Sequence, residues 1–178
     1  MQTSFHSLNS LSHKRVTIFL VPESKKLPKF LKDMDKENIM EQVIQADTSG
    51  FEGKNGQILH ISRCQSITDK VVLLVGLGKQ FTNNEIEKIG GAISIRLNAL
   101  KAKEADIYFD WDEKSLSVQK KMSNAELITR LCFGIKIRNY AFTKYYTKSI
   151  VVLHVPGRRL LGIDITTEDA KTIFVKLE

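Results

Sequence analysis

The sequence lacks the features that mark secreted and membrane-spanning proteins. Its 178 residues include only two cysteines, Cys64 and Cys132, which lie far apart, so we expect a reducing compartment and no disulfide framework. The longest apolar runs, such as residues 71–75, are far shorter than the roughly 20 residues of a membrane-spanning helix. The polar N-terminus also lacks the basic-then-apolar order of a secretory signal. These absences predict a cytoplasmic protein that has no membrane partner.

Acidic residues are scarce in one long stretch of the chain. The net charge is +7, and the contents of 42% hydrophobic and 26% charged residues match a soluble globular domain. Between residues 114 and 159 the only acidic residue is Glu126. The basic residues of this stretch are Lys114, Lys120, Lys121, Arg130, Lys136, Arg138, Lys144, Lys148, Arg158 and Arg159. Such a stretch favours either a polyanion or acidic partner, or a solvated basic face with no dedicated ligand.

Short β-branched runs alternate with longer helical patterns, which predicts one α/β domain. Helices are expected over residues 27–45 and after each of two capping boxes, Thr82 with Glu85 and Ser123 with Glu126. The adjacent pair Gly90 and Gly91 in the second helix predicts that another backbone packs closely there. The predicted strands are residues 16–21, 57–61, 71–75, 105–109 and 150–155.

The sequence offers no catalytic or metal-binding constellation. His60 and His154 lie in predicted strands, where we expect core or edge roles, and His6 and His13 lie in a segment that need not be ordered. No histidine pair has the spacing of a metal site, and no Gly-x-Ser-x-Gly elbow is present. Cys132 lies on an apolar helical stripe and is expected to be a buried, inert thiol. We therefore assign no catalytic residue and no metal ligand to this chain.

One turn could cradle a phosphate. Gly76, Gly78 and Lys79 follow a predicted central strand and precede a helix, which is where α/β proteins bind nucleotides. Phe81 occupies the place of the third glycine of a dinucleotide fingerprint, so the motif is incomplete. A tight strand-to-helix turn is the favoured interpretation, and a nucleotide site is the alternative.

Two segments together resemble the N-terminal domain of the leucine aminopeptidase (cytosol aminopeptidase) family. The first is Val72-Leu73-Leu74-Val75-Gly76-Leu77-Gly78-Lys79 with the following Thr82, Glu85, Ile89, Gly90 and Gly91. The second is the glycine-containing helix near residues 125–134 with the run Arg138-Asn139-Tyr140-Ala141-Phe142-Thr143-Lys144-Tyr145-Tyr146-Thr147-Lys148. The resemblance covers roughly residues 15–150.

The resemblance implies a macro-domain-like three-layer α/β/α sandwich with a mixed central sheet. In the family this domain precedes a larger catalytic domain, where two divalent metals (zinc, manganese or magnesium) activate water to remove N-terminal residues from peptides. It also implies assembly as hexamers and, in some bacterial relatives, DNA binding. The motif positions, which we expect to serve folding and docking, are Gly76, Gly78, Gly90, Gly91, Tyr140, Phe142, Tyr145 and Lys148.

The family's metal-binding motif, of the kind Asn-Thr-Asp-Ala-Glu-Gly-Arg, is absent, so no ligand can be carried over. We expect a flexible segment at residues 1–14, the family domain at 15–155 and an extension or linker remnant at 156–178, within an excised domain or a truncated gene product. The expected partners are the C-terminal catalytic domain and other subunits. Alternatives are a polyanion- or DNA-binding module, or a macro-like nucleotide-binding domain. The candidate contact residues are Lys136, Arg138, Tyr140, Lys144, Tyr145 and Lys148.

Overall fold

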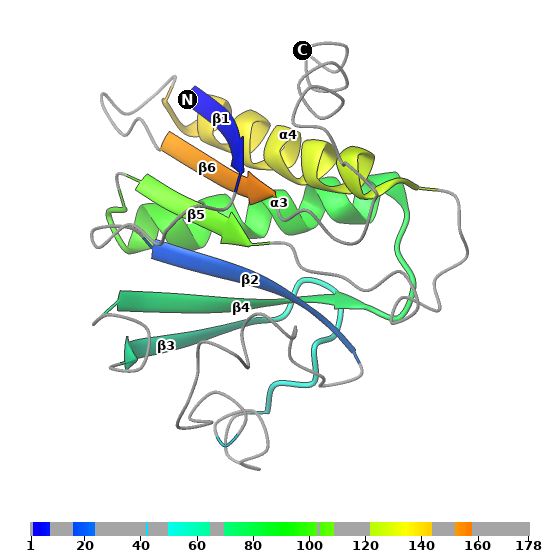
Figure 1. Cartoon of the computed structure of the whole chain (residues 1–178), viewed down its shortest axis with the longest axis vertical. Coiled ribbons are helices and arrows are strands. Elements are labelled where there is room, and N and C mark those ends of the chain that lie inside the picture. Colours follow the sequence, from blue (N-terminus) through cyan, green and yellow to red (C-terminus); the bar gives the residue numbers. More distant parts are fainter. Residues whose placement is uncertain are drawn as a thin grey trace.

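The structure is a computed structural model of the whole chain. It describes residues 2–7, 16–23, 42, 50–64, 70–102, 104–108, 122–143 and 152–157. Four strands come first in these segments, and two helices then alternate with two further strands (Figure 1). In chain order the elements are β1 (Gln2–Ser7), β2 (Val16–Pro22), β3 (Ile58–Cys64), β4 (Lys70–Gly78), α3 (Asn83–Ala99), β5 (Glu104–Tyr108), α4 (Asn124–Thr143) and β6 (Val152–Gly157).

The strands form a 6-stranded mixed sheet in the order β1-β6-β5-β2-β4-β3. All neighbouring pairs are parallel except β3 with β4, which is antiparallel. The α/β class and the mixed sheet expected from the sequence are confirmed. Strand β4 pairs with a neighbour on each side, as its continuous apolar run predicts, and Val72 to Val75 are fully buried.

Strand β1 was not expected. Residues 2–7 fall within the segment that the sequence suggests is flexible, yet they form a parallel edge strand on β6, with Gln2 opposite Val152 and Ser7 opposite Gly157. The sequence QTSFHS has no apolar alternation, so its local pattern gives no strand signal. The strand depends on its pairing with the edge of β6, which is distant in the sequence.

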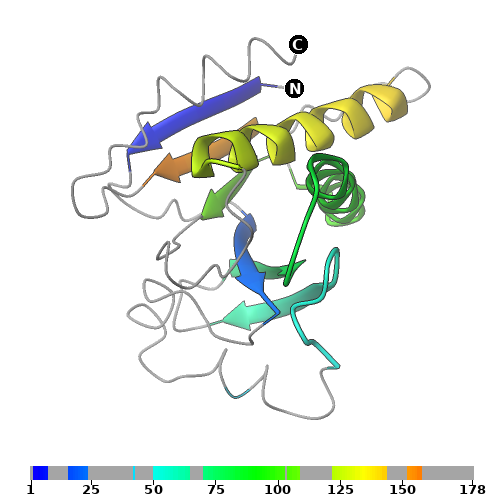
Figure 2. The ribbon, with the colours of Figure 1, turned by 90° about the vertical axis from the view of Figure 1, so that its right-hand side faces the viewer.

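Helices α3 and α4 lie side by side on one face of the sheet (Figure 2). The alternate residues Ile18 and Leu20 of β2 and Leu73 and Val75 of β4 pack against them. Most helical residues of this core recur at three- and four-residue intervals, which predicts an apolar stripe. The helical core residues are Ile86, Ile89, Ile93, Leu97, Ala125, Leu127, Ile128, Leu131, Cys132 and Ile135.

The opposite face of the sheet is also buried. Phe19 of β2 stacks on Tyr108 of β5 with ring centroids 5.2 Å apart, and Phe51 is 2% exposed. A sheet that is buried on both faces belongs to a layered α/β architecture. The helix expected over residues 27–45 lies outside the described residues except for Gln42.

Candidate functional site

Helices α3 and α4 cross at two glycines. A Cβ atom on Gly90 would fall against the backbone of Leu131 and Ile135, and a Cβ on Gly134 would fall against the backbone of Glu87, all under 3.0 Å. No residue other than glycine fits at either position without moving a helix. The predicted close backbone approach at the glycine pair is therefore confirmed at Gly90.

Gly91 differs from its neighbour. A Cβ there would meet only the side chain of Arg138, at 3.9 Å, which is ordinary van der Waals contact. Only one member of the glycine pair is thus required by helix packing. The partner glycine that completes the crossing is Gly134, 44 residues further along the chain than Gly90.

Arg130 links the two helices beside this crossing. Its guanidinium donates to the Glu87 carboxylate of α3 at 3.0 Å and to Glu126 of α4 at 2.9 Å. Burial alone would lower the pKa of Arg130, but the hydrogen bonds to these two carboxylates raise it overall. The bond to Glu126 follows the i,i+4 spacing and could be anticipated from the sequence, whereas the bond to Glu87 could not.

Both predicted helix starts are capped. The Thr82 hydroxyl accepts from the Glu85 N–H, and the Glu85 carboxylate accepts from the Thr82 N–H at 2.6 Å. This backbone hydrogen bond, followed by the bond from the Thr82 hydroxyl, lowers the pKa of Glu85. At α4 the Ser123 hydroxyl accepts from the Glu126 N–H at 3.1 Å, while the Glu126 carboxylate accepts from Arg130.

The glycine turn, Gly76 to Lys79, begins within the last residues of β4 and is packed against residues 50–57. Its backbone N–H groups donate to that segment, Gly76 to Gln57 O at 2.8 Å and Gly78 to Gly53 O at 2.9 Å. A Cβ on Gly76 would collide with the backbone of Gly53 and Lys54. The amides that a phosphate-binding turn presents to its ligand are therefore engaged by the protein itself, which favours the structural interpretation of this turn.

The side chain of Gln57 organises this segment. Its amide oxygen accepts from the N–H groups of Glu52 and Lys54 at 2.8 and 3.2 Å, and its amide nitrogen donates to Gly50 O at 2.6 Å. Gly50, Gly53 and Gly56 all have φ between 57° and 74°, where glycine has no steric penalty. Three glycines so close together are a sequence signal of irregular backbone. No sequence signal identifies Gln57 as the side chain that hydrogen-bonds to this segment.

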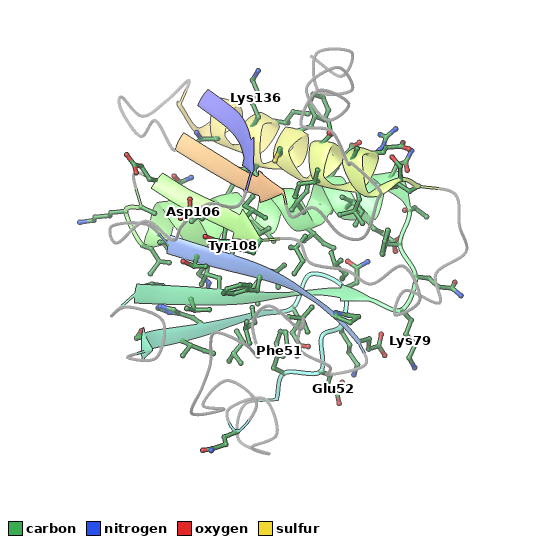
Figure 3. The ribbon with its side chains drawn as sticks, in the orientation of Figure 1. Phe51, Glu52, Lys79, Asp106, Tyr108 and Lys136 are labelled. Atoms are coloured by element: carbon green, nitrogen blue, oxygen red, sulfur yellow. The ribbon has the colours of Figure 1, made fainter. Side chains whose placement is uncertain are left out.

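Charged side chains surround the turn in opposite-sign pairs. Lys79 is 78% exposed and lies 3.5 Å from the Glu23 carboxylate, and Lys54 is ion-paired with Glu52. The pKa of Lys54 is raised by its hydrogen bond to the Glu52 carboxylate and by the negative charge of that carboxylate. Figure 3 shows Lys79 and Glu52 far from Lys136, which lies on α4. The nucleotide-site candidates Gly76, Gly78 and Lys79 are thus each engaged by other residues of this chain.

Part of the candidate basic surface lies on α4. Arg138 is exposed and Lys136 is half-buried, while Tyr140 belongs to the last turns of the helix. Lys144, Tyr145 and Lys148 lie outside the described residues. The structure therefore places two basic residues of the candidate surface, Lys136 and Arg138, on one helix. Their function in contacting a partner stays a prediction.

A polar row crosses the parallel part of the sheet. In register, Thr17 of β2 lies opposite Asp106 of β5, Asp106 opposite His154 of β6, and His154 opposite Ser4 of β1. Thr17 and Asp106 are buried. Asp106 lies inside β5, in agreement with the strand predicted at residues 105–109.

Cys132 and His60 are the remaining side chains that the sequence offered as candidates for chemistry. Cys132 is fully buried, and burial raises the pKa of its thiol to about 12, far from a reactive thiolate. His60 is exposed on β3, where its ring lies 3.2 Å from the Ser62 hydroxyl. Within the described part of the chain, no three His, Cys, Asp or Glu side chains converge as metal ligands would. Nor does any helix in that part have the length and hydropathy to span a membrane.

Comparison with known proteins identifies the family. Residues 4–149 match the family model described as the cytosol aminopeptidase family, N-terminal domain. The chain belongs to this family. Two proteins named "Probable cytosol aminopeptidase", from the Gardel and Welgevonden strains of Ehrlichia ruminantium, are each 28% identical to it over 100 residues. Each alignment spans 55% of this chain and 17% of the Ehrlichia protein.

Solved structures support the same fold. A tomato leucine aminopeptidase superposes with a TM-score of 0.70 at 13% identity, covering 99% of this chain and 35% of the tomato chain. The bottromycin maturation enzyme BotP in complex with Mn gives 0.56 at 14% identity, covering 92% and 29%. The macrodomain of Thermus aquaticus DarG gives 0.57 at 11% identity, covering 88% of this chain and 98% of that one. The macro-like fold expected from the sequence is confirmed.

Proposed function

We propose that this chain is the non-catalytic N-terminal domain of a metal-dependent leucine (cytosol) aminopeptidase of the cytoplasm. The parent enzyme releases N-terminal amino acids from peptides, and this domain serves its assembly and shapes access to its active site. The observation that carries the proposal is the family match over residues 4–149, which is specific to the N-terminal domain. The chain spans about a third of the tomato enzyme that shares its fold, which leaves room for a catalytic domain.

The chemistry belongs to the part of the enzyme outside this chain. Two divalent metals, zinc, manganese or magnesium, would polarise the scissile carbonyl and lower the pKa of the attacking water. BotP, which has the same fold over most of this chain, was solved with Mn. The metals would be held in the catalytic domain, and subunits would assemble as hexamers.

The contacts of the candidate residues favour docking over the alternative functions. Arg130 belongs to the basic stretch, but its charge is engaged by Glu87 and Glu126. The amides of Gly76 and Gly78 donate to backbone carbonyls. The family's glycine positions therefore support a rigid fold, which is what a docking domain requires.

The proposal is tested by exchanging domains in a relative. The Ehrlichia aminopeptidase would be expressed intact, without its N-terminal domain, and with residues 1–149 of this chain in that place. We expect the intact enzyme and the chimera to hydrolyse leucine amide with added manganese, and the truncated enzyme to lose most of this activity.

Two results would contradict the proposal. One is a chimera that is folded by circular dichroism but as inactive as the truncated enzyme. The other is leucine-amide turnover by this chain alone that follows the purified protein and is blocked by a chelator. The isolated chain is expected to show no turnover with manganese or zinc.

A further inference from the structure

Two exposed isoleucines lie on the solvent side of the helix pair. Ile95 of α3 is 52% exposed and Ile137 of α4 is 51% exposed, and they are the exposed large hydrophobic residues of the described part of the chain. Single exposed apolar residues are common on protein surfaces. Two of them on neighbouring helices, near the point where those helices cross, form a site that can be contacted as a unit.

Helical spacing measured from the Glu87–Arg130 ion pair indicates that these two positions lie on the same side of the helix pair. Ile95 follows Glu87 by eight residues and Ile137 follows Arg130 by seven, so each isoleucine lies roughly two turns further along the same helical stripe. Because Glu87 and Arg130 are 3.0 Å apart, the two stripes border each other. The crossing at Gly90 and Gly134 keeps the helices close between the ion pair and the isoleucines.

Two further side chains border this surface. Phe133 lies between Arg130 and Ile137 on the same stripe of α4, where it packs against the core and is half-buried. Arg138 is exposed, and its Cβ lies 3.9 Å from the Cβ position of Gly91. We call Ile95, Phe133, Ile137 and Arg138 the outer seam.

The two helical segments that carry the outer seam have basic side chains and no acidic ones. Residues 88–102 contain Lys88, Arg96 and Lys101 and no acidic residue, and residues 127–143 contain Arg130, Lys136 and Arg138 and no acidic residue. The nearest carboxylates on the two stripes, Glu87 and Glu126, are both bound by Arg130. An apolar centre with a positive rim fits a partner that has apolar side chains surrounded by carboxylates.

We propose that the outer seam docks an acidic polypeptide surface that carries apolar side chains. A second copy of this chain would bring positive rims together, which opposes self-association. A nucleic acid would meet the positive rim, but binding of single strands relies on aromatic stacking, and the seam's centre is aliphatic apart from the half-buried Phe133. The proposal concerns this chain's own surface and goes beyond the proposed function.

The test uses the full chain and a synthetic helical peptide that presents leucine and glutamate on one face. The isoleucine methyl groups are observed by NMR during titration. We expect the signals of Ile95 and Ile137 to shift and saturate. Ile137→Ser and Arg138→Glu should each weaken binding about tenfold, because one removes an apolar contact and the other reverses the rim charge. Both side chains are exposed, so the thermal midpoints of the variants should match that of the parent chain.

The control is Lys79→Glu, an equal charge reversal on the exposed turn after β4, which should leave the affinity unchanged. The same peptide with serine in place of leucine should bind at least about tenfold more weakly. Equal binding by all variants, or no shift of the two methyl signals, would overturn the proposal. So would a DNA duplex or phosphatidylserine vesicle that shifts these signals more strongly than the peptide does.

Discussion

The helix crossing and the glycine turn at the end of β4 both depend on glycine, for different physical reasons. At the crossing, Gly90 and Gly134 keep ordinary helical geometry and are required because the backbone of the other helix occupies the space of a side chain. At the turn, Gly76 makes room for Gly53 and Lys54, while Gly78 has a φ of 75°. One region therefore uses glycine to bury apolar surface, and the other uses it to bring backbone hydrogen-bonding groups together.

The largest effect is expected at the crossing. Gly134→Ala would force a methyl group against the carbonyl of Glu87, and the helices would have to separate. We expect a loss of about 3 kcal/mol in the free energy of unfolding, measured by urea titration. Gly90→Ala should behave alike, because its methyl group would meet the backbone of Leu131.

Gly91→Ala is the matched control for this prediction. Its methyl group would reach only the Arg138 side chain, so the substitution should stabilise the chain by about 0.5–1 kcal/mol through helix propensity. If Gly91→Ala destabilised the chain as much as Gly90→Ala, the distinction between the two glycines would be wrong.

A smaller loss is expected at the turn. Gly76→Ala would push residues 53–54 away and break the hydrogen bonds that join Gly76 to Gln57 and Gly78 to Gly53. We expect a cost of about 2 kcal/mol, with faster hydrogen exchange at the Gly78 amide. Gly50→Ala, at a φ of 57° with open space around its Cβ position, should cost only about 1 kcal/mol. Equal costs would show that the two segments are not packed as described.

The smallest effect concerns the capping box that joins the turn to α3. The pKa of Glu85 is lowered by the Thr82 backbone hydrogen bond, so its stabilising contribution is present above its unfolded pKa near 4.5 and is lost as the pH falls through the lowered value. Glu85→Ala should therefore destabilise the chain at pH 7 and have less effect near pH 3. A difference from the parent chain that stays constant across this range would refute the cap's pH dependence.

These two regions also show how far the sequence could be interpreted. The apolar stripe around Ile89 and the capping box at Thr82 are local patterns, and both predicted α3 correctly. Gly90 gave a local signal of close packing, but nothing near it in the sequence identified Gly134 as its partner. The residue types alone could not distinguish a phosphate cradle from a turn whose amides are already bonded, because the carbonyl acceptors belong to residues 53–57.

Long-range pairing explains the other differences. Strand β1 carries no apolar pattern of its own and is held by β6, about 150 residues away. The Glu87–Arg130 ion pair joins residues 43 apart. The family resemblance supplied the mixed sheet and the macro-like fold, which periodicity alone did not predict.

The most direct measurement for the docking function is the molar mass of the chimeric aminopeptidase by light scattering. If this chain serves assembly, the chimera will have the same subunit number as the intact Ehrlichia enzyme, and the truncated enzyme will have fewer subunits. A folded chimera with the mass of the truncated enzyme would contradict the assembly function, even if the domain is correctly assigned to its family.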